Sequence, residues 1–300
     1  MTKPPVLRIV ISLVAGLITF GLAAILVRLA DADPTAVVMV RTLGALFFLL
    51  PFYWTRPASQ RTSFSGKEGI FFALAGISLG LHFTLWTASL SYTSVASASV
   101  LVCIHPIILI IAERLLFKSR FAVGVWLGVI TAFAGSVLLG LTDESSSIGS
   151  HPLLGNTLAF LAAVAFVVYI LIGQELRKKA GWLEYIFPVY TWSAIFCVVI
   201  FALSGFPMGE GTMFWIASIG LALGPQLIGH GAMNYAVKYV QPTMLSMSIL
   251  VEPILATGFA ILLFSEVPSM LSFVAMSIIV AGLILAWFSR IRQSTTTQKV

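Results

Sequence analysis

Apolar residues follow one another along this chain in long runs, and short polar segments separate one run from the next. Each run holds roughly 20 residues, the length that an α-helix needs to cross the hydrocarbon core of a bilayer. The pattern predicts an all-α integral membrane protein with ten transmembrane helices. Their expected bounds are 7–29, 34–54, 69–90, 94–116, 121–141, 152–172, 182–203, 213–236, 244–264 and 270–288.

The composition agrees with this pattern. Apolar residues make up 59% of the chain and charged residues only 9%, whereas soluble domains carry about 25% charged residues. The net charge of +6 would point to nucleic acid only if the basic residues formed a cluster, and here they stand singly or in short groups between apolar runs. No nucleic-acid partner is therefore expected. Cys103 and Cys197 lie inside apolar runs without metal-ligand spacing, so we expect two buried core thiols.

The basic residues gather on one side of the predicted helices. If the amino terminus is cytoplasmic, all of the 17 Lys and Arg residues except Arg28, Arg41 and Arg114 fall in cytoplasmic segments. Cytoplasmic loops of membrane proteins carry an excess of Lys and Arg. We expect a multi-pass protein of the cell (inner) membrane with both termini in the cytoplasm. The acidic residues assigned to the outside are Asp31, Asp33, Asp143, Glu144, Glu210 and Glu266.

The chain also repeats itself. A shift of 147 positions aligns two stretches without gaps, including a Pro in the middle of a predicted helix on both sides. The aligned pairs include Tyr92 with Tyr239, Ser99 with Ser246, His105 with Glu252, and Pro106 with Pro253. Because each half has an odd number of helices, the second half is inverted relative to the first. Inverted repeats are typical of secondary transporters.

The aligned stretches carry motifs of a known family. The sequence ASLSYTSVAS runs on to His105-Pro106, and YAVKYVQP continues to Glu252-Pro253 and ends at Ser265-Glu266. These motifs resemble the EamA family of the drug/metabolite transporter superfamily, in which a Glu follows the mid-helix Pro of each half by 13 residues. The second half keeps this Glu as Glu266, whereas the first half has Ser119 there.

The resemblance implies a particular organisation. The first EamA-like repeat would span 1–145 with helices one to five, and the second 152–290 with helices six to ten. Residues 291–300 would form a cytoplasmic tail. The family likeness further implies a central cavity and, as a frequent role, the export of small metabolites.

Ionisable side chains inside the predicted helices are candidates for function, because lone charges are expensive in lipid. Glu252 and its repeat mate His105 each precede a Pro near the middle of a helix. Together they could form a proton or cation site. Alternatively, Glu252 caps the kink and His105 bonds a neighbouring carbonyl. Arg41 lies about two turns inside the second helix and could pair with a substrate carboxylate or with an acid of the protein.

A second group of polar residues lies on the eighth helix. Gln226, His230 and Asn234 recur at spacings of four, which on an α-helix forms one polar face directed into the bundle. His82 and Trp86 have the same spacing on the third helix and could place an aromatic plate beside a polar group. These five residues could bind substrate, or they could simply bond helix to helix.

We interpret the chain as a permease rather than an enzyme. It lacks a His-Glu-x-x-His zinc motif, and no nucleophile stands beside a base, so no catalytic residue, metal or cofactor is expected. The rings of like charge and the carbonyl filter motif of a channel are also missing from the sequence. A flippase, or a carrier for a lipid-linked or nucleotide-sugar-type substrate, is the alternative.

The expected mechanism is alternating access around one cavity near the membrane midplane. Helices one to four and six to nine should line this cavity, with helices five and ten as outer braces. We expect the cargo to be a small amino-acid-like metabolite that is exported, with proton coupling as one option. The sequence does not distinguish a monomer from a homodimer, and the expected surroundings are the lipid bilayer.

Overall fold

The computed structural model describes residues 6–57, 66–93, 95–141, 151–264 and 269–297. These residues form helices joined by turns and short connections, and none of them lies in a strand. The helices, in chain order, are α1 (Val6–Gly21), α2 (Ala23–Ala30), α3 (Pro34–Trp54), α4 (Gly66–Ser89), α5 (Val95–Val102), α6 (His105–Phe117), α7 (Val123–Leu141), α8 (Pro152–Lys179), α9 (Trp182–Leu203), α10 (Gly211–Leu221), the π-helix η2 (Ala222–His230), α11 (Gly231–Ala236), α12 (Pro242–Ile249), α13 (Glu252–Phe264) and α14 (Met270–Thr297).

The predicted all-α membrane fold is confirmed. Within the described residues, nine helical stretches are long and apolar enough to span a bilayer, and the shorter apolar helix Val123–Leu139 supplies the tenth. The second and seventh spans have the expected bounds. α8 and α14 run further than predicted; the residues that extend α8, such as Gln174, Glu175 and Arg177, are good helix formers. The segment expected as a tail at 291–300 is therefore helical up to Thr297.

The fourth and ninth spans are both broken in the middle, and the two breaks correspond. α6 begins at the residue before Pro106, and two residues separate it from the end of α5. In the same way, α13 begins at the residue before Pro253, and two residues separate it from the end of α12. A Pro inside a helix removes a backbone donor and clashes with the preceding turn. The same hydrogen bond closes both breaks, from Ile107 N to Ile104 O and from Ile254 N to Val251 O, each 3.0 Å long. The repeat read from the sequence thus has a counterpart in the backbone.

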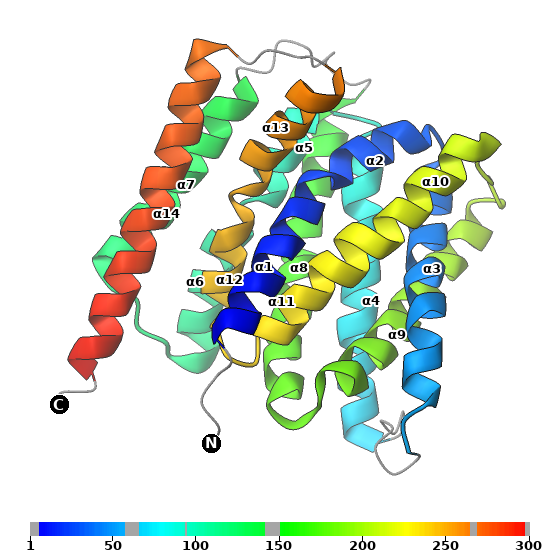
Figure 1. Cartoon of the computed structure of the whole chain (residues 1–300), viewed down its shortest axis with the longest axis horizontal. Helices are drawn as coiled ribbons and strands as arrows, with labels where there is room; N and C mark the ends of the chain where they lie inside the picture. The colour runs from blue at the N-terminus through cyan, green and yellow to red at the C-terminus, as the bar shows by residue number, and fades with distance from the viewer. Residues whose placement is uncertain (1–5, 58–65, 94, 142–150, 265–268, 298–300) are drawn as a thin grey trace.

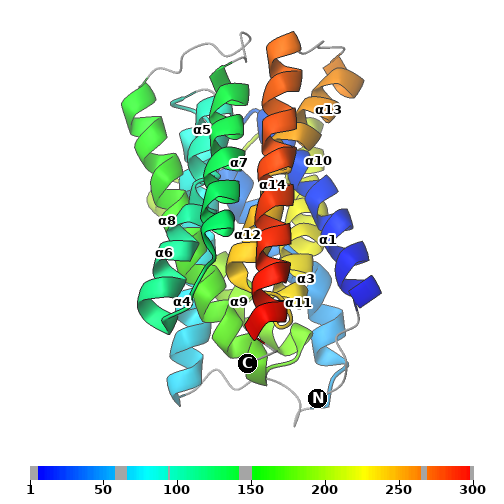
Figure 2. The ribbon, with the colours of Figure 1, turned by 90° about the vertical axis from the view of Figure 1, so that its left-hand side faces the viewer.

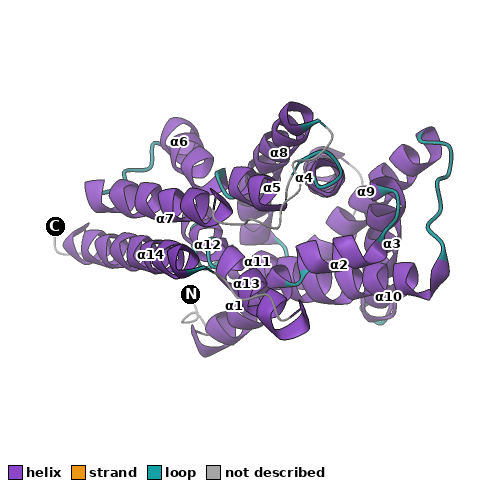
Figure 3. Ribbon diagram, turned by 90° about the horizontal axis from the view of Figure 1, so that it is seen from above, coloured by secondary structure: helices purple, strands orange, loops and turns teal. Residues whose placement is uncertain are grey.

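α7 and α14, the last helices of the two halves, pack on each other at one side of the molecule (Figures 1 and 3). Figure 2 shows them side by side in front of the other helices. Gly128 and Gly282 allow this close approach, because a Cβ on either glycine would meet backbone atoms of the opposite helix. α7 also packs against α5, which joins the pair to the rest of the bundle.

The remaining helices form the main bundle. α4 packs against α8 and α9, α3 packs against α9, and α1 packs against η2. Gly76 and Gly80 bring α4 close to α9. Cys103 and Cys197 are buried, as expected. α1 begins and α14 ends at the lower end of the bundle in Figure 1; this end is called the termini end below, and the other is called the opposite end.

Several acidic residues assigned to the outside of the membrane cannot be placed. Asp143, Glu144 and Glu266 lie outside the described residues. Asp33 does have a structural role, because its side chain accepts a hydrogen bond from Thr35 N at 2.8 Å and caps α3.

Candidate substrate cavity

A small cavity of about 50 Å³ lies inside the main bundle, at the breaks in the fourth and ninth spans. Of the described residues that line it, none belongs to α7 or α14, which agrees with their expected role as braces. α9 does not contribute to the lining either, although the seventh helix was expected to. The lining residues are Phe20, Ala23, Arg41, His82, Phe83, Trp86, Val102, His105, Phe166, Pro225, His230, Ile249 and Glu252.

The two helix breaks bring His105 and Glu252 into this cavity. Each is the first residue of a half-helix, His105 in α6 and Glu252 in α13. The amino-terminal end of a helix carries partial positive charge and free N–H groups, which favours an anion nearby. Two such ends, contributed by the two halves, therefore meet at the cavity. This arrangement resembles the discontinuous helices with which secondary transporters hold anionic substrate groups.

Glu252 supplies the only carboxylate among the cavity-lining residues. Glu252 is half-buried and lines the cavity. Within the described part of the chain, the carboxylate forms no hydrogen bond with another residue and no ion pair. It interacts electrostatically with Arg41 from across the cavity. Glu252 is thus free to bind a proton or a cationic group.

Arg41 is buried at the wall of the cavity. Its Nε donates a hydrogen bond of 3.1 Å to Oε1 of Gln226, and its guanidinium lies 3.7 Å from the centre of the Phe83 ring. The expected pairing with an acid of the protein is not found among the described residues. Because the groups in direct contact with Arg41 are neutral, no direct ion pair cancels its positive charge. The other expectation, a substrate carboxylate as partner, is compatible with this geometry.

His105 connects the two halves of the protein. Its Nδ1 lies 2.6 Å from Oγ of Ser246 on α12. The alternative in which His105 bonds a neighbouring carbonyl is therefore not what the structure shows. The imidazole also lies near the ring of Phe166, with 4.8 Å between ring centres. The contact with Ser246 joins the inner turns of α6 and α12.

His82 and His230 come from the third and eighth helices, which correspond in the two halves, and their ring centres are 6.1 Å apart. Nδ1 of His82 lies 2.9 Å from the carbonyl oxygen of Ala162. Because a carbonyl can only accept, this contact assigns the proton of a neutral His82 to Nδ1 and leaves Nε2 as an acceptor. Phe83 and Phe166 pack around both imidazoles. An aromatic enclosure therefore surrounds the polar groups.

The predicted polar face of the eighth helix is only partly correct. The segment Ala222–His230 is a π-helix, so the α-helical spacing used to place the three residues on one face does not apply there. Of the three residues only His230 lines the cavity; Gln226 accepts a hydrogen bond from Arg41, which does line it, and Asn234 does not line the cavity. The side-chain oxygen of Asn234 accepts a hydrogen bond from the Tyr169 hydroxyl. The backbone carbonyl of Asn234 accepts another from Nε of Arg177.

Two buried polar atoms of cavity-lining residues have no hydrogen-bond partner among the described protein atoms. They are Nε1 of Trp86 and Nδ1 of His230. Buried polar groups in proteins are nearly always satisfied, so such atoms at a cavity wall indicate contact with water or a ligand. The walls thus offer donors, one uncancelled cation, one carboxylate and several aromatic faces. No cluster of metal-binding side chains occurs in the described ranges.

Several residues of the site carry no signal in the sequence. Phe20, Phe83 and Phe166 are apolar residues inside apolar runs, and nothing in their spacing separates them from lipid-facing positions. Ser246 is different, because it already aligns with Ser99 in the repeat, next to the helix break. The repeat alignment could have selected it as the partner of a residue in the other half.

Two five-helix halves around a small cavity lined by polar and aromatic side chains are an arrangement that occurs among membrane transporters. The chain belongs to the EamA-like transporter family, whose model matches it twice, at residues 7–141 and 153–288. The predicted family is therefore confirmed, and the protein is a multi-pass membrane transporter.

Individual relatives agree with this assignment. An uncharacterized transporter of Bacillus subtilis, YdfC, is 25% identical over 70% of this chain and 68% of its own length. Uncharacterized transporters of Clostridium kluyveri and Archaeoglobus fulgidus are 23% and 22% identical, and cover 78% and 92% of this chain and 77% and 95% of their own lengths. A solved crystal structure superposes with a TM-score of 0.77 over 93% of this chain and 96% of the other at 16% identity, which shows a shared fold.

Proposed function

We propose that this transporter is a secondary carrier that exports a small amino-acid-like metabolite across the cell membrane by alternating access. The observation that carries the proposal is the pairing of one uncancelled cation, Arg41, with one unpartnered carboxylate, Glu252, inside an aromatic cavity. The outward direction follows the frequent role of the family. The distribution of basic residues supports termini in the cytoplasm.

The proposed cargo follows from the chemistry of the walls. A substrate carboxylate would bind near Arg41 and the amino-terminal ends of the half-helices, where negative charge is favoured. A substrate ammonium would bind Glu252, and an apolar side chain would contact Phe83 and Phe166. Because Glu252 has no partner of its own, it can take a proton when cargo is absent, which would couple transport to protons.

The size of the cavity requires a moving protein. Ligand pockets usually measure about 300–1,000 Å³, whereas this cavity is about 50 Å³. A metabolite therefore cannot enter without separation of the helices around the cavity. Rocking of the two halves would provide that space, first from one side of the membrane and then from the other.

Counterflow in proteoliposomes tests this proposal. Purified protein would be reconstituted and loaded with single unlabelled metabolites, and the uptake of labelled amino acids, nucleotide sugars and other metabolites measured. We expect saturable, trans-stimulated uptake of an amino-acid-like compound, which falls strongly in Arg41→Gln and Glu252→Gln. A leucine at a lipid-facing position, such as Leu153→Ala, is the matched control and should leave uptake unchanged.

Other outcomes would contradict the proposal. Unitary currents or flux that rises linearly without saturation would indicate a pore. Movement of a fluorescent lipid between leaflets, without counterflow of any soluble compound, would favour the flippase. Counterflow of nucleotide sugars alone would support the other carrier reading.

A further inference from the structure

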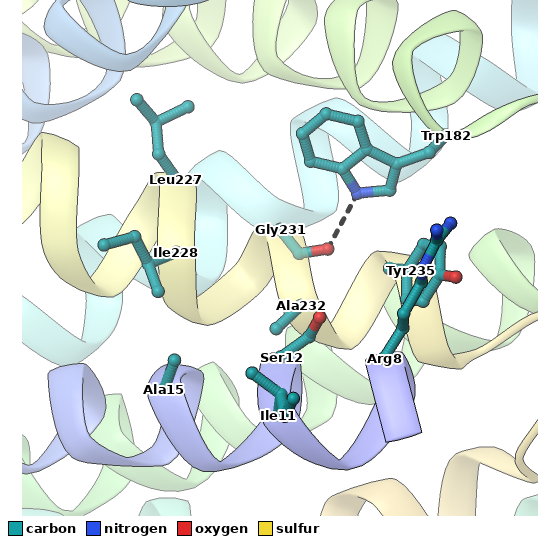
Figure 4. Close-up of a pocket in the computed structure, with 10 residues that line it drawn as sticks. All are labelled: Arg8, Ile11, Ser12, Ala15, Trp182, Leu227, Ile228, Gly231, Ala232 and Tyr235. Carbon is teal, nitrogen blue, oxygen red and sulfur yellow. Dashed lines mark hydrogen bonds between the residues drawn. The ribbon is translucent and has the colours of Figure 1, made fainter. Parts of the chain in front are cut away.

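A second hollow lies on the outside of the bundle, away from the central cavity. It is a groove of about 560 Å³ between α1 and the segment formed by η2 and α11, with Trp182 of α9 at its back (Figure 4). Its described lining residues are Arg8, Ile11, Ser12, Ala15, Trp182, Leu227, Ile228, Gly231, Ala232 and Tyr235.

The two ends of the groove differ in chemistry. Ile11, Ala15, Leu227 and Ile228 make an apolar channel along the helix direction. Arg8 and Tyr235 both line the groove, and in the view of Figure 4 they appear at the same end of it. The hydroxyl of Ser12 lies between the charged end and the apolar end. The groove thus combines an apolar channel with a single cationic mouth.

The groove is separate from the central cavity. Gly16 of α1 approaches Gly229 and Ala232 so closely that a Cβ there would lie about 3.1 Å from the Ala232 side chain. This contact lies between the groove and the cavity. The indole of Trp182 also donates a hydrogen bond of 2.8 Å to the carbonyl of Gly231, which closes the back of the groove (Figure 4). An occupant must therefore enter from the surface of the protein.

That surface faces the bilayer. Leu7, Ile11 and Val14, on the outer side of α1, are all exposed in the protein, and α1 belongs to a membrane-spanning stretch. The molecules that surround such a surface are lipids. Arg8 is the third residue of this stretch and lies in its first turn, the depth at which charged side chains meet lipid headgroups.

We propose that this groove binds one anionic phospholipid, with an acyl chain along the apolar channel and the phosphate at Arg8. The hydroxyls of Ser12 and Tyr235 lie within the same lining and can donate to headgroup oxygens. Basic pockets between transmembrane helices bind anionic headgroups in other membrane proteins. The site does not depend on the identity of the transported compound and stands apart from the proposed function.

The position of the groove places the lipid behind one wall of the central cavity. Leu227 and Ile228 line the groove, whereas Pro225 and His230 of the same π-helix line the central cavity. A lipid in the groove therefore packs against the back of the segment that carries two cavity groups.

Native mass spectrometry with defined lipids tests the proposal. The full-length protein, delipidated in detergent, would be titrated with an equimolar mixture of phosphatidylglycerol and phosphatidylcholine. We expect one tightly retained lipid, with phosphatidylglycerol preferred about fivefold, the factor that one Arg contributes at an anionic surface. Arg8→Gln should abolish this preference, and Arg8→Lys should keep it. Lys67→Gln is the matched control, because Lys67 is an exposed basic residue on α4 outside the groove.

The shape of the groove is tested separately. Ala15→Phe fills the apolar channel and should reduce retention of both lipids at least fivefold, and Ala15→Leu provides a smaller plug if the Phe variant does not fold. Unchanged preference in Arg8→Gln, or unchanged retention in folded Ala15 variants, would overturn the proposal. Displacement of the lipid by glycerophosphoglycerol, which has the headgroup without acyl chains, would also overturn it.

Discussion

The fourth and ninth helices have two ends that the repeat makes equivalent, yet the two ends differ in the structure. At the termini end, α6 packs against α12, and Oε1 of Glu113 accepts a hydrogen bond of 3.2 Å from Thr243 N. α12 is buried at nearly every position. At the opposite end, the described residues of α5 and α13 do not pack together in the same way, and residues 252–259 of α13 are all only half-buried.

The fourth and ninth helices are therefore packed closely together at the termini end, which is closed, and less closely at the opposite end. The sequence halves are related by a shift of 147 positions, so the two arrangements should be exchangeable at a modest energetic cost. Under that shift, the contact of His105 with Ser246 becomes a contact of Glu252 with Ser99. We propose that the first contact marks this state and that the second forms in the alternate state.

The largest expected effect comes from locking the closed end. In a background with Cys103→Ala and Cys197→Ala, the pair Glu113→Cys and Thr243→Cys would be joined by a short bifunctional thiol reagent. Because the pair spans the contact between α6 and α12, crosslinking should abolish nearly all transport. Counterflow in proteoliposomes before and after reduction of the crosslink measures the effect.

The single cysteine variants, treated with the same reagent, are the controls and should keep their activity. If the crosslinked pair transports at the rate of the reduced protein, the contact at the termini end does not open during the cycle.

The second effect concerns the carboxylate of Glu252, because the equivalent position of the first half is His105. Glu252 faces Arg41, His82, His105 and His230 across the cavity, and it alone is acidic. Glu252→Gln keeps the shape of the side chain but cannot exchange a proton. Transport by the unaltered protein should change with pH by up to about tenfold per pH unit, the limit for one proton. In the variant, initial rates of counterflow should be flat across the same pH range.

His105→Asn is the matched substitution at the equivalent position of the first half. It should leave a pH dependence, because the carboxylate remains. An unchanged pH profile in Glu252→Gln would make this residue structural.

The smallest effect separates the two equivalent serines. Ser246→Ala removes the partner of His105 and should weaken the closed end, shifting the population toward the alternate state by about two- to tenfold. Ser99→Ala should shift it by a similar factor in the opposite direction, because it removes the proposed partner of Glu252. Alkylation rates of a cysteine at His230, measured with a membrane-impermeant reagent in oriented vesicles, report the population. Shifts in the same direction would contradict the exchange.

Much of the fold could be predicted from the sequence. Length and hydropathy place ten spans, because the bilayer fixes the length of each helix and excludes other backbone structures. The mid-helix prolines predicted where the fourth and ninth helices break. The packing of α7 on α14 was not predicted, and only the structure shows that Gly128 and Gly282 lie at this contact.

The site was less accessible to sequence reasoning. Charged and polar residues such as Glu252 and Arg41 stand out in apolar helices, and the structure brings them to one cavity. The π-helix around Pro225 could not be predicted, because its wider turn leaves no periodic signal in nine residues. Phe166 was also missed, since an aromatic side chain facing the cavity and one facing lipid look alike in sequence.

Exchange between the two states requires the termini end to open while the opposite end closes. Spin labels at Lys118 and Lys238 would report the termini end, and labels at Ser91 and Leu262 the opposite end; all four side chains are exposed. Pulsed electron–electron distance measurements in nanodiscs would compare the unaltered sequence with Ser246→Ala in both labelled pairs. In Ser246→Ala, the distance between the labels at Lys118 and Lys238 should be longer than in the unaltered sequence, and the distance between the labels at Ser91 and Leu262 should be shorter. Distances that stay fixed at both ends, or lengthen together, would contradict it.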